Sequence, residues 1–223
     1  MGLPALDSDS YQIQIRRDLR HSEASSIYEI QLHGERYAMK VFHDNGDEGF
    51  TEKGRDLNRF RCEVNAYSHL LSYGVCDSGV VPYCYGYIDR LNPAFFSPHL
   101  NHFASDKFHP QAIILEFLAD TESLNCVNYS IDRFVGVLRG IQEIHRALVL
   151  HFDVYPKNIL IVPGEPERVV WIDFDVAKTF SAMEDMTPKD RYLFEDEKLL
   201  AASLGDLFER DQKEGLPPNT KYY

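Results

Sequence analysis

The residues most able to do chemistry lie in two short motifs in the second half of the chain. The first contains His151, Asp153 and Asn158, in the spacing His-x-Asp-x-x-Pro-x-Asn. The second contains Asp173 and Asp175, on either side of a phenylalanine. A carboxylate can accept a proton, and carboxylate and amide oxygens are hard ligands that suit Mg²⁺. The motifs together are typical of a site that combines proton transfer with a bound cation.

Apolar runs between the motifs predict how both could reach one site. Residues 159–162 and 169–172 are apolar and flank the turn sequence Pro-Gly-Glu-Pro at 163–166, a pattern typical of two strands joined by a turn. Asp173 directly follows the second run, so we expect it at the end of a buried strand and not in a surface turn. Asp153 could instead be a helix-capping residue, but the asparagine five residues later favours a site.

The start of the chain predicts an antiparallel sheet. Residues 11–20 alternate apolar and polar side chains from Tyr11 onward, and residues 26–32 alternate less regularly. The sequence Leu-His-Gly-Glu-Arg at 32–36 predicts a hairpin turn into a third strand at 37–42.

Lys40 and Glu63 are a candidate pair in this first part of the chain. Lys40 lies in the third strand, and Glu63 lies in a predicted helix over 57–72. Glu63 shares the apolar face of that helix with Phe60 and Tyr67, and a carboxylate on an apolar face needs a partner. We expect Lys40 to be that partner. The alternative is a Glu63 that is solvated at the edge of the helix.

Further elements follow from the apolar patterns. A helix over 131–148 begins at Ser130, which we expect to be its N-cap residue. The segment 91–110 is rich in Pro, Phe, His and Asn and predicts an irregular insertion. Two more strands and a last helix are expected at 80–87, 112–118 and about 190–210.

This order of elements and motifs resembles the protein-kinase-like superfamily over roughly residues 11–180. It is also similar to small fungal kinase-like proteins with a Trp-Ile-Asp-Phe-Asp motif, and to aminoglycoside and choline phosphotransferases. The resemblance implies an α+β, two-lobed protein-kinase-like fold. Residues 1–118 would form an antiparallel-sheet N-lobe with the insertion near 91–110, and residues 119–223 would form a reduced, mostly helical C-lobe.

The resemblance also implies roles for the residues of the two motifs. Asp153 matches the catalytic base that orients the acceptor hydroxyl, and Lys157 could reach the transferring phosphate. Asn158 and Asp173 match the ligands of Mg²⁺. Asp175 replaces the usual glycine after the phenylalanine and could join the metal shell or form a local cap.

The nucleotide would be held by the first part of the chain. Lys40 matches the lysine that grips the α and β phosphates of ATP, with Glu63 as its partner. Glu116 and Leu118 match the hinge, where backbone groups would hold adenine. Serines at the turn between the first two strands could contact phosphates in place of glycines, namely Ser25 and Ser26.

Three departures from the superfamily pattern bear on function. Residues 20–26 read Arg-His-Ser-Glu-Ala-Ser-Ser where glycines would let backbone amides approach phosphates, and Glu23 adds negative charge there. Phe152 replaces the arginine that reads a phosphorylated activation loop, so we expect no control of that kind. Only 50 residues follow Asp173, so the acceptor stays unidentified and a protein partner could cover the short C-lobe.

Composition limits the classes of function. The 223 residues carry a formal net charge of −12 and are 44% apolar, which supports a folded core and argues against a nucleic-acid partner. We find no signal peptide or membrane span, so we expect no membrane partner and a cytoplasmic location, with the nucleus left open. The four cysteines lack metal-binding spacing and are expected to be buried free thiols.

Together these features predict transfer of the γ-phosphoryl group of ATP, with Mg²⁺, to a hydroxyl of a small molecule or a restricted protein substrate. The alternative is a pseudokinase, a nucleotide-binding or scaffold module without phosphoryl transfer, which the missing glycines and the short C-lobe favour. A pocket with a different ligand and a different chemistry is a third possibility, since a fold does not determine a function.

Overall fold

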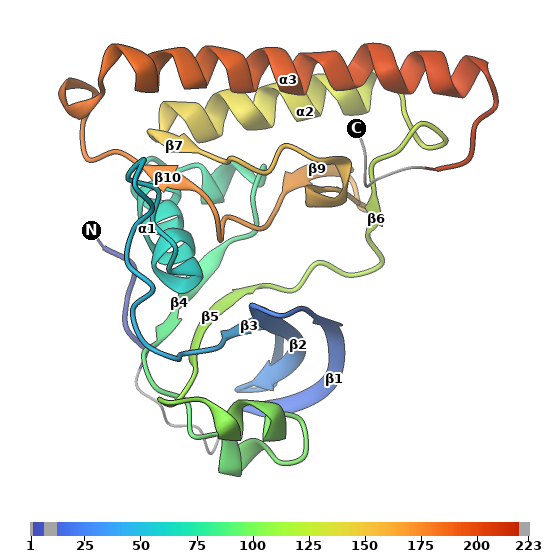
Figure 1. The fold of residues 1–223 in the computed structure, drawn as a ribbon. Helices are drawn as coiled ribbons and strands as arrows, with labels where there is room; N and C mark the ends of the chain where they lie inside the picture. Colours follow the sequence, from blue (N-terminus) through green and yellow to red (C-terminus); the bar gives the residue numbers. More distant parts are fainter. Residues whose placement is uncertain (1, 7–12, 219–223) are drawn as a thin grey trace.

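The computed structural model describes residues 2–6 and 13–218. An antiparallel sheet of five strands forms the lower half of the molecule in Figure 1, in the order β1-β2-β3-β5-β4. These strands are Gln14–His21 (β1), Ser25–Leu32 (β2), Glu35–Phe42 (β3), Cys84–Ile88 (β4) and Gln111–Glu116 (β5). The predicted hairpin is confirmed, because Leu32 of β2 lies opposite Glu35 of β3. Residues 11 and 12 of the expected first strand lie outside the described residues.

Helix α1 (Arg59–Ser72) packs against β4 and β5. The side chain of Asn58 accepts a hydrogen bond from the backbone amide of Arg61 and so caps the start of the helix. Gly74 has a φ of 71° just after the helix, a conformation that glycine adopts without strain and that commonly ends a helix. The buried face of α1 includes Glu63, as the sequence pattern predicts.

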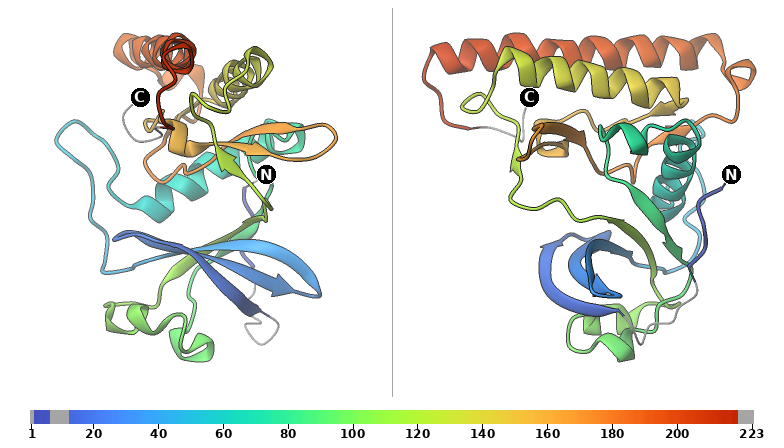
Figure 2. Two further views of the ribbon diagram at one scale, coloured as in Figure 1. Left: turned by 90° about the vertical axis from the view of Figure 1, so that its right-hand side faces the viewer. Right: turned by 180° about the vertical axis from the view of Figure 1, so that it is seen from behind.

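Two long helices cover the opposite end of the molecule (Figure 1). They are α2 (Ile131–Arg146) and α3 (Pro188–Lys213), which lie side by side (Figure 2). Ser130 caps α2 as predicted, since its side chain accepts a hydrogen bond from the amide of Arg133. The last helix is slightly longer at both ends than the 190–210 expected.

Short strands lie between these helices and the large sheet. One small sheet has the order β6-β8-β9, and β7 pairs with β10. These strands are Glu122–Ser123 (β6), Val149–Leu150 (β7), Ile159–Val162 (β8), Arg168–Trp171 (β9) and Lys178–Thr179 (β10). The predicted pairing of the two strands between the motifs is confirmed, because Ile159 lies opposite Trp171.

The architecture is therefore α+β, with a five-stranded antiparallel sheet and three α-helices among the described residues. It is compatible with a small two-lobed fold. No helix in residues 2–6 and 13–218 has the length and apolar character needed to cross a membrane. All four cysteines are free and buried, as predicted.

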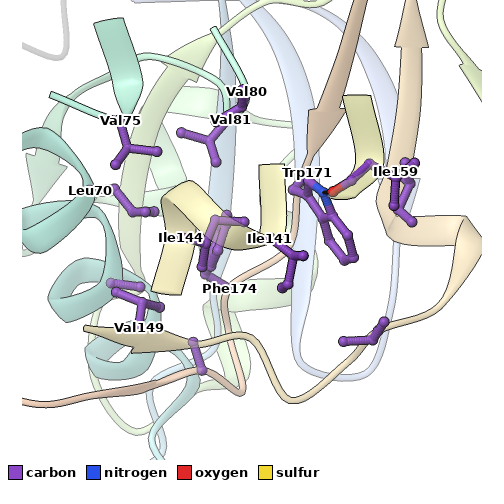
Figure 3. Packing of buried hydrophobic residues seen from close by; sticks show 14 of the residues in the cluster. Leu70, Val75, Val80, Val81, Ile141, Ile144, Val149, Ile159, Trp171 and Phe174 are labelled. Atoms are coloured by element: carbon purple, nitrogen blue, oxygen red, sulfur yellow. Dashed lines mark hydrogen bonds between the residues drawn. The ribbon is translucent and has the colours of Figure 1, made fainter. Parts of the chain in front are cut away.

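A continuous hydrophobic cluster joins α1, α2 and β9. In Figure 3, Ile141 of α2 lies between Leu70 of α1 and Trp171 of β9, and all three belong to this cluster. Trp171 is completely buried, and its Nε1 donates a hydrogen bond of 3.2 Å to the carbonyl oxygen of Val137. Trp171 is the last residue of β9, and Asp173 follows two residues later. The packing of Trp171 therefore fixes the position of Asp173.

The strand expected over 80–87 forms only in its second half. Pro82 has no amide hydrogen to donate to a neighbouring strand. The carbonyl oxygen of Val80 instead accepts a hydrogen bond of 2.9 Å from the amide of Trp171, so the start of this segment is bonded to β9.

Two other boundaries differ from or refine the prediction. The strand expected over 112–118 ends at Glu116, so the last two residues leave the sheet. The segment 91–110 is irregular as predicted, with two short 3₁₀ turns at Pro93–Phe96 and Asn101–Ser105. It packs against the face of the large sheet that is turned away from the helices (Figure 1).

Gly140→Ala should destabilise the fold. A Cβ at this position would lie 2.5 Å from Cδ1 of the Trp171 ring, which is completely buried. Overpacking costs about 1–3 kcal/mol, and alanine regains at most about 1 kcal/mol in helix propensity. We expect the free energy of unfolding to fall by about 1–2 kcal/mol in a urea titration.

Arg139→Ala, at the exposed neighbouring position of α2, is the control for this change. It should alter the free energy of unfolding by less than about 0.5 kcal/mol. A Gly140→Ala variant as stable as the wild type would contradict the close contact with Trp171.

Candidate active site

A cavity of about 270 Å³ lies between the large sheet and the small three-stranded sheet. Ile27 of β2 and Ala38 of β3 line it from one side, and Leu160 of β8 lines it from the other. Its volume is slightly below the roughly 300–1,000 Å³ usual for small-molecule pockets. Its walls are mostly apolar, with Lys40 and Asp173 among the few charged groups. The cavity therefore suits a ligand with an apolar part and a charged part.

Lys40 is the centre of the charged groups at this cavity. Its Nζ lies 2.6 Å from Oε2 of Glu63, 2.6 Å from Oδ1 of Asp173 and 3.7 Å from Oδ2 of Asp175. A guanidinium nitrogen of Arg59 lies 3.1 Å from the other oxygen of Asp175. Glu63 is only 1% exposed, so its predicted pairing with Lys40 is confirmed and the solvated alternative is wrong. One cation on β3 thus joins α1 to the loop after β9.

The surroundings of these groups set their charge. Burial alone would lower the pKa of Lys40, but the nearby carboxylates outweigh it and raise that pKa. Burial raises the pKa of Glu63 to about 7, against the attraction of Lys40. Burial would also raise the pKa of Asp173, but Lys40 holds it below its usual value. Asp173 is therefore negatively charged at neutral pH, as a cation ligand must be.

The loop after β7 holds the predicted base and its neighbours together. Nδ2 of Asn158 donates hydrogen bonds to the carbonyl oxygen of Asp153 (2.9 Å) and to its carboxylate Oδ2 (2.7 Å). Nζ of Lys157 lies 2.9 Å from the same Oδ2. These contacts fix the carboxylate of Asp153 and do not use its Oδ1.

Two hydrogen bonds join this loop to the second motif. Nδ1 of His151 accepts from the amide of Asp153 (3.3 Å), so we assign the ring proton to Nε2, which donates to the carbonyl oxygen of Ile172 (3.0 Å). The amide of Ile172 donates to the carbonyl oxygen of Asn158 (3.0 Å). Asp173 therefore begins directly beyond a fixed junction. Its φ of 71° is uncommon for a residue with a side chain.

Glu197 of α3 holds the same loop, although no sequence motif indicated it. Its carboxylate accepts hydrogen bonds from the amides of His151 (3.1 Å) and Phe152 (2.7 Å), and lies 2.6 Å from Nε2 of His145. Burial alone would raise the pKa of Glu197, but these partners hold it below its usual value. Phe152 has a φ of 61°, so Glu197 stabilises a strained backbone next to the predicted base.

Some buried polar atoms have no hydrogen-bond partner, and two of them belong to residues that line the cavity. In the described residues they are Glu63 Oε1, Tyr67 Oη, His145 Nδ1, Asn158 Oδ1 and Thr179 Oγ1. Such atoms cost free energy unless a ligand or water binds them. Glu63 and Tyr67 line the cavity itself.

The donor set near the cavity fits Mg²⁺. The unpartnered Oδ1 of Asn158 and the carboxylate of Asp173 are hard oxygen ligands. Mg²⁺ is commonly held by one or two protein groups together with phosphate oxygens. Within residues 2–6 and 13–218, no group of three or more His, Cys, Asp or Glu side chains could hold a metal ion. A magnesium ion here would therefore share its coordination with the phosphates of a ligand.

The predicted hinge residues Glu116 and Leu118 both line the cavity. The amide of Glu116 donates to the carbonyl oxygen of Tyr83 (2.8 Å), and its carboxylate is held by Arg168 and by the amide of Tyr83. Leu118 lies beyond the end of β5, and no hydrogen bond among the described residues uses its backbone. The backbone of Leu118 is therefore better placed than that of Glu116 to form hydrogen bonds with the ring of a bound ligand.

Ser25 and Ser26, predicted to contact phosphates, do not line the cavity. The hydroxyl of Ser26 lies 2.9 Å from Nδ1 of His21 and 3.1 Å from Nε2 of His102, beside the insertion. Successive side chains of a strand point to opposite faces, and it is Ile27 that faces the cavity. The amide of Ser25 is bonded within its own turn. The structure therefore does not bring these two serines to the site.

Other residues of the site were not indicated by any motif. Leu19 and Arg20 of β1 both line the cavity, although simple alternation would place only one of them there. Glu197 shares the buried stripe of α3 with Phe194 and Ala201. Like Glu63 on α1, Glu197 is a carboxylate on the apolar face of a helix. Such a carboxylate needs a bonding partner, and this signal could have identified Glu197 from the sequence.

Glu197→Gln should lower the free energy of unfolding at pH 7 by about 1–3 kcal/mol, because an amide has one acceptor oxygen where three donors need bonds. The folded-state pKa of Glu197 lies below the ordinary 4.5. The advantage of the wild type is thus complete above that value and is lost as the pH falls towards the folded-state pKa.

Urea titrations at pH 7 and about pH 3.5 test this expectation. Asp196→Asn, at the exposed neighbouring position, is the matched control and should show no such loss. A difference between wild type and Glu197→Gln that stays the same at both pH values would count against the loop-holding role of the carboxylate.

The sequence matches no protein-family model and no curated protein. Its function therefore has to be inferred from the groups at the site.

Proposed function

We propose that this protein is an ATP- and Mg²⁺-dependent phosphotransferase with a two-lobed, protein-kinase-like fold. Residues 1–118 form the N-lobe and residues 119–223 the C-lobe. The protein transfers the γ-phosphoryl group of ATP to a hydroxyl of a small molecule or of a restricted protein substrate. The adenine ring of ATP lies in the cavity between the two sheets, and its phosphates are directed to Lys40 and Asp173.

The arrangement of Asn158 is the observation that carries this proposal. Its amide nitrogen bonds the carboxylate of Asp153 at 2.7 Å, while its Oδ1 is buried without a partner. Its carbonyl oxygen accepts from the amide of Ile172, immediately before Asp173. One residue thus ties the candidate base to the candidate metal ligand. A purely structural asparagine would bond both ends of its buried amide.

The roles of the side chains follow from their positions. Lys40, oriented by Glu63, would contact the α and β phosphates, and Asp173 and Asn158 would hold the metal ion. Bound Mg²⁺ neutralises the charge that develops on the transferring group. Asp153 would orient the acceptor hydroxyl and take its proton. The acceptor oxygen then bonds the γ-phosphorus, whose bond to the bridging oxygen breaks, and the nucleoside diphosphate leaves.

Two further groups support this chemistry. Lys157, at 2.9 Å from Asp153, would bring a positive charge to the transferring phosphoryl group. Asp175 lies between Lys40 and Arg59 and would add negative charge beside the metal ion.

The acceptor is proposed to approach on the side of α3. A second hollow of about 380 Å³ lies there, lined by Phe152 and Tyr155 of the catalytic loop and by Leu200 of the helix. The two aromatic residues flank Asp153 in the sequence, and all three apolar side chains are exposed. An apolar acceptor or a protein partner that covers this face would exclude water from the reaction.

The alternative function is a pseudokinase that binds nucleotide without chemistry. It is favoured by the turn between β1 and β2, where the amide of Ser22 donates to the carbonyl oxygen of Ser25 (2.9 Å) and the amide of Ser25 donates to the hydroxyl of Ser22 (3.1 Å). These amides are not free to bind phosphates, as those of a glycine-rich loop would be. In a thermal-shift titration, MgATP at 100 times its Kd would stabilise a nucleotide-binding form by about 2.7 kcal/mol.

Asp153→Asn should reduce the release of ADP from MgATP, with water as the acceptor, by about 100-fold or more. Its affinity for MgADP, measured by isothermal titration, should stay within about twofold of the wild type, because Asp153 acts on the acceptor. Asp173→Asn should lower both turnover and Mg²⁺-dependent nucleotide affinity, because a metal ligand is lost.

Asp206→Asn, an exposed change on α3, is the control and should behave as the wild type in both assays. Equal turnover in the wild type and in both site variants would refute the enzymatic proposal. Nucleotide binding by the wild type with no turnover would favour the pseudokinase.

A further inference from the structure

An irregularity in β1 places two consecutive side chains at the cavity. Asp18 pairs with Tyr28 and Arg20 pairs with Ile27, so Leu19 has no partner on β2. Such a bulge interrupts the alternation of a strand and turns a side chain to a new direction. Leu19 and Arg20 both line the cavity as a result.

Arg20 is the cation at this cavity that no carboxylate neutralises. Among the described residues, Lys40 and Arg20 are the basic side chains that line the cavity. Lys40 already bonds Glu63 and Asp173 at 2.6 Å. Arg20 is exposed, and its side chain makes no hydrogen bond or ion pair in the described part of the chain. The charge of its guanidinium contributes, after Lys40 and His151, to holding the pKa of Asp173 below its usual value.

The balance of charge at the site demands such a cation. Lys40 and Arg59 are already paired with the carboxylates of Asp173 and Asp175, and Glu63, whose pKa is about 7, adds further negative charge. A polyphosphate entering this environment would meet an excess of negative charge. In the turn after Arg20, the amides of Ser22 and Ser25 are bonded within the turn, and there is no glycine through which the backbone could approach phosphates.

We propose that Arg20 is a second phosphate-binding group of this site beside Lys40, and that it replaces the glycine-rich loop that the chain lacks. Its planar guanidinium can donate two parallel hydrogen bonds to phosphate oxygens. This inference rests on the proposed function. It adds that the site selects ligands by their phosphates, so that a nucleoside diphosphate or triphosphate binds far more tightly than the nucleoside.

Isothermal titration of the wild type, Arg20→Gln and Arg16→Gln with adenosine and with MgADP tests this assignment. Arg16 is the matched control, because it is exposed on the same strand, bonds Gln31 and does not line the cavity. Arg20→Gln should weaken MgADP binding by roughly 10- to 100-fold, the effect of losing hydrogen bonds from a charged donor. It should leave adenosine binding within about twofold, and Arg16→Gln should match the wild type for both ligands.

The outcomes separate this inference from the proposed function. A wild type that binds MgADP, together with an Arg20→Gln variant that binds it equally well, would refute the role of Arg20 and leave the nucleotide site standing. An equal loss of adenosine and MgADP in Arg20→Gln would refute it too, since it would point to a damaged cavity. A wild type that binds neither ligand at millimolar concentration would refute both.

Discussion

A single buried ammonium connects three parts of the chain that are far apart in sequence. Lys40 on β3 bonds Glu63 on α1 and Asp173 after β9, both at 2.6 Å. Burying a charge costs several kcal/mol unless partners compensate it, and removing one partner of a buried pair is strongly destabilising. The positions of α1, of the large sheet and of the second motif relative to one another are therefore coupled. Losing either carboxylate without a replacement would leave the buried charge of Lys40 with one partner fewer, which costs free energy.

The second constraint acts on the loop that carries Asp153, from the opposite side. Glu197 on α3 binds the amides of His151 and Phe152, and His151 in turn bonds the carbonyl oxygen of Ile172. Residues with positive φ stand at both motifs, at Phe152 and Asp173. Such conformations persist only where surrounding bonds hold them, and they concentrate at functional sites. The two long helices thus act as the frame that keeps the loop in a strained form.

Local patterns were enough to predict much of this molecule. Local sequence predicts the hairpin over 32–36 and the N-cap Ser130, because both depend on neighbouring residues. The pairing of Lys40 with Glu63 could be predicted because a carboxylate on an apolar helix face needs a partner. Pro82 indicates that the strand expected over 80–87 starts late, because proline has no amide hydrogen to donate to a neighbouring strand. The tertiary bond from Trp171 to Val80, which replaces that part of the strand, has no local signal.

The parts of the site that the sequence misplaced or missed have two physical causes. Which face of a strand a residue occupies depends on register and bulges, and these are set by pairing with other strands. Ser26 therefore points to the insertion, and the bulge at Leu19 turns Arg20 to the cavity. Glu197 lies 45 residues or more from its loop partners, so only the folded chain brings them together.

A crystal structure with Mg²⁺ and a non-hydrolysable ATP analogue tests the central claim most directly. We expect the adenine ring of the analogue between the two sheets and its phosphates beside Lys40. We expect a metal ion about 2.1 Å from Oδ1 of Asn158 and from the carboxylate of Asp173. An empty cavity at millimolar analogue, or an analogue bound elsewhere with Asn158 Oδ1 still without a ligand, would contradict a nucleotide-dependent phosphotransferase.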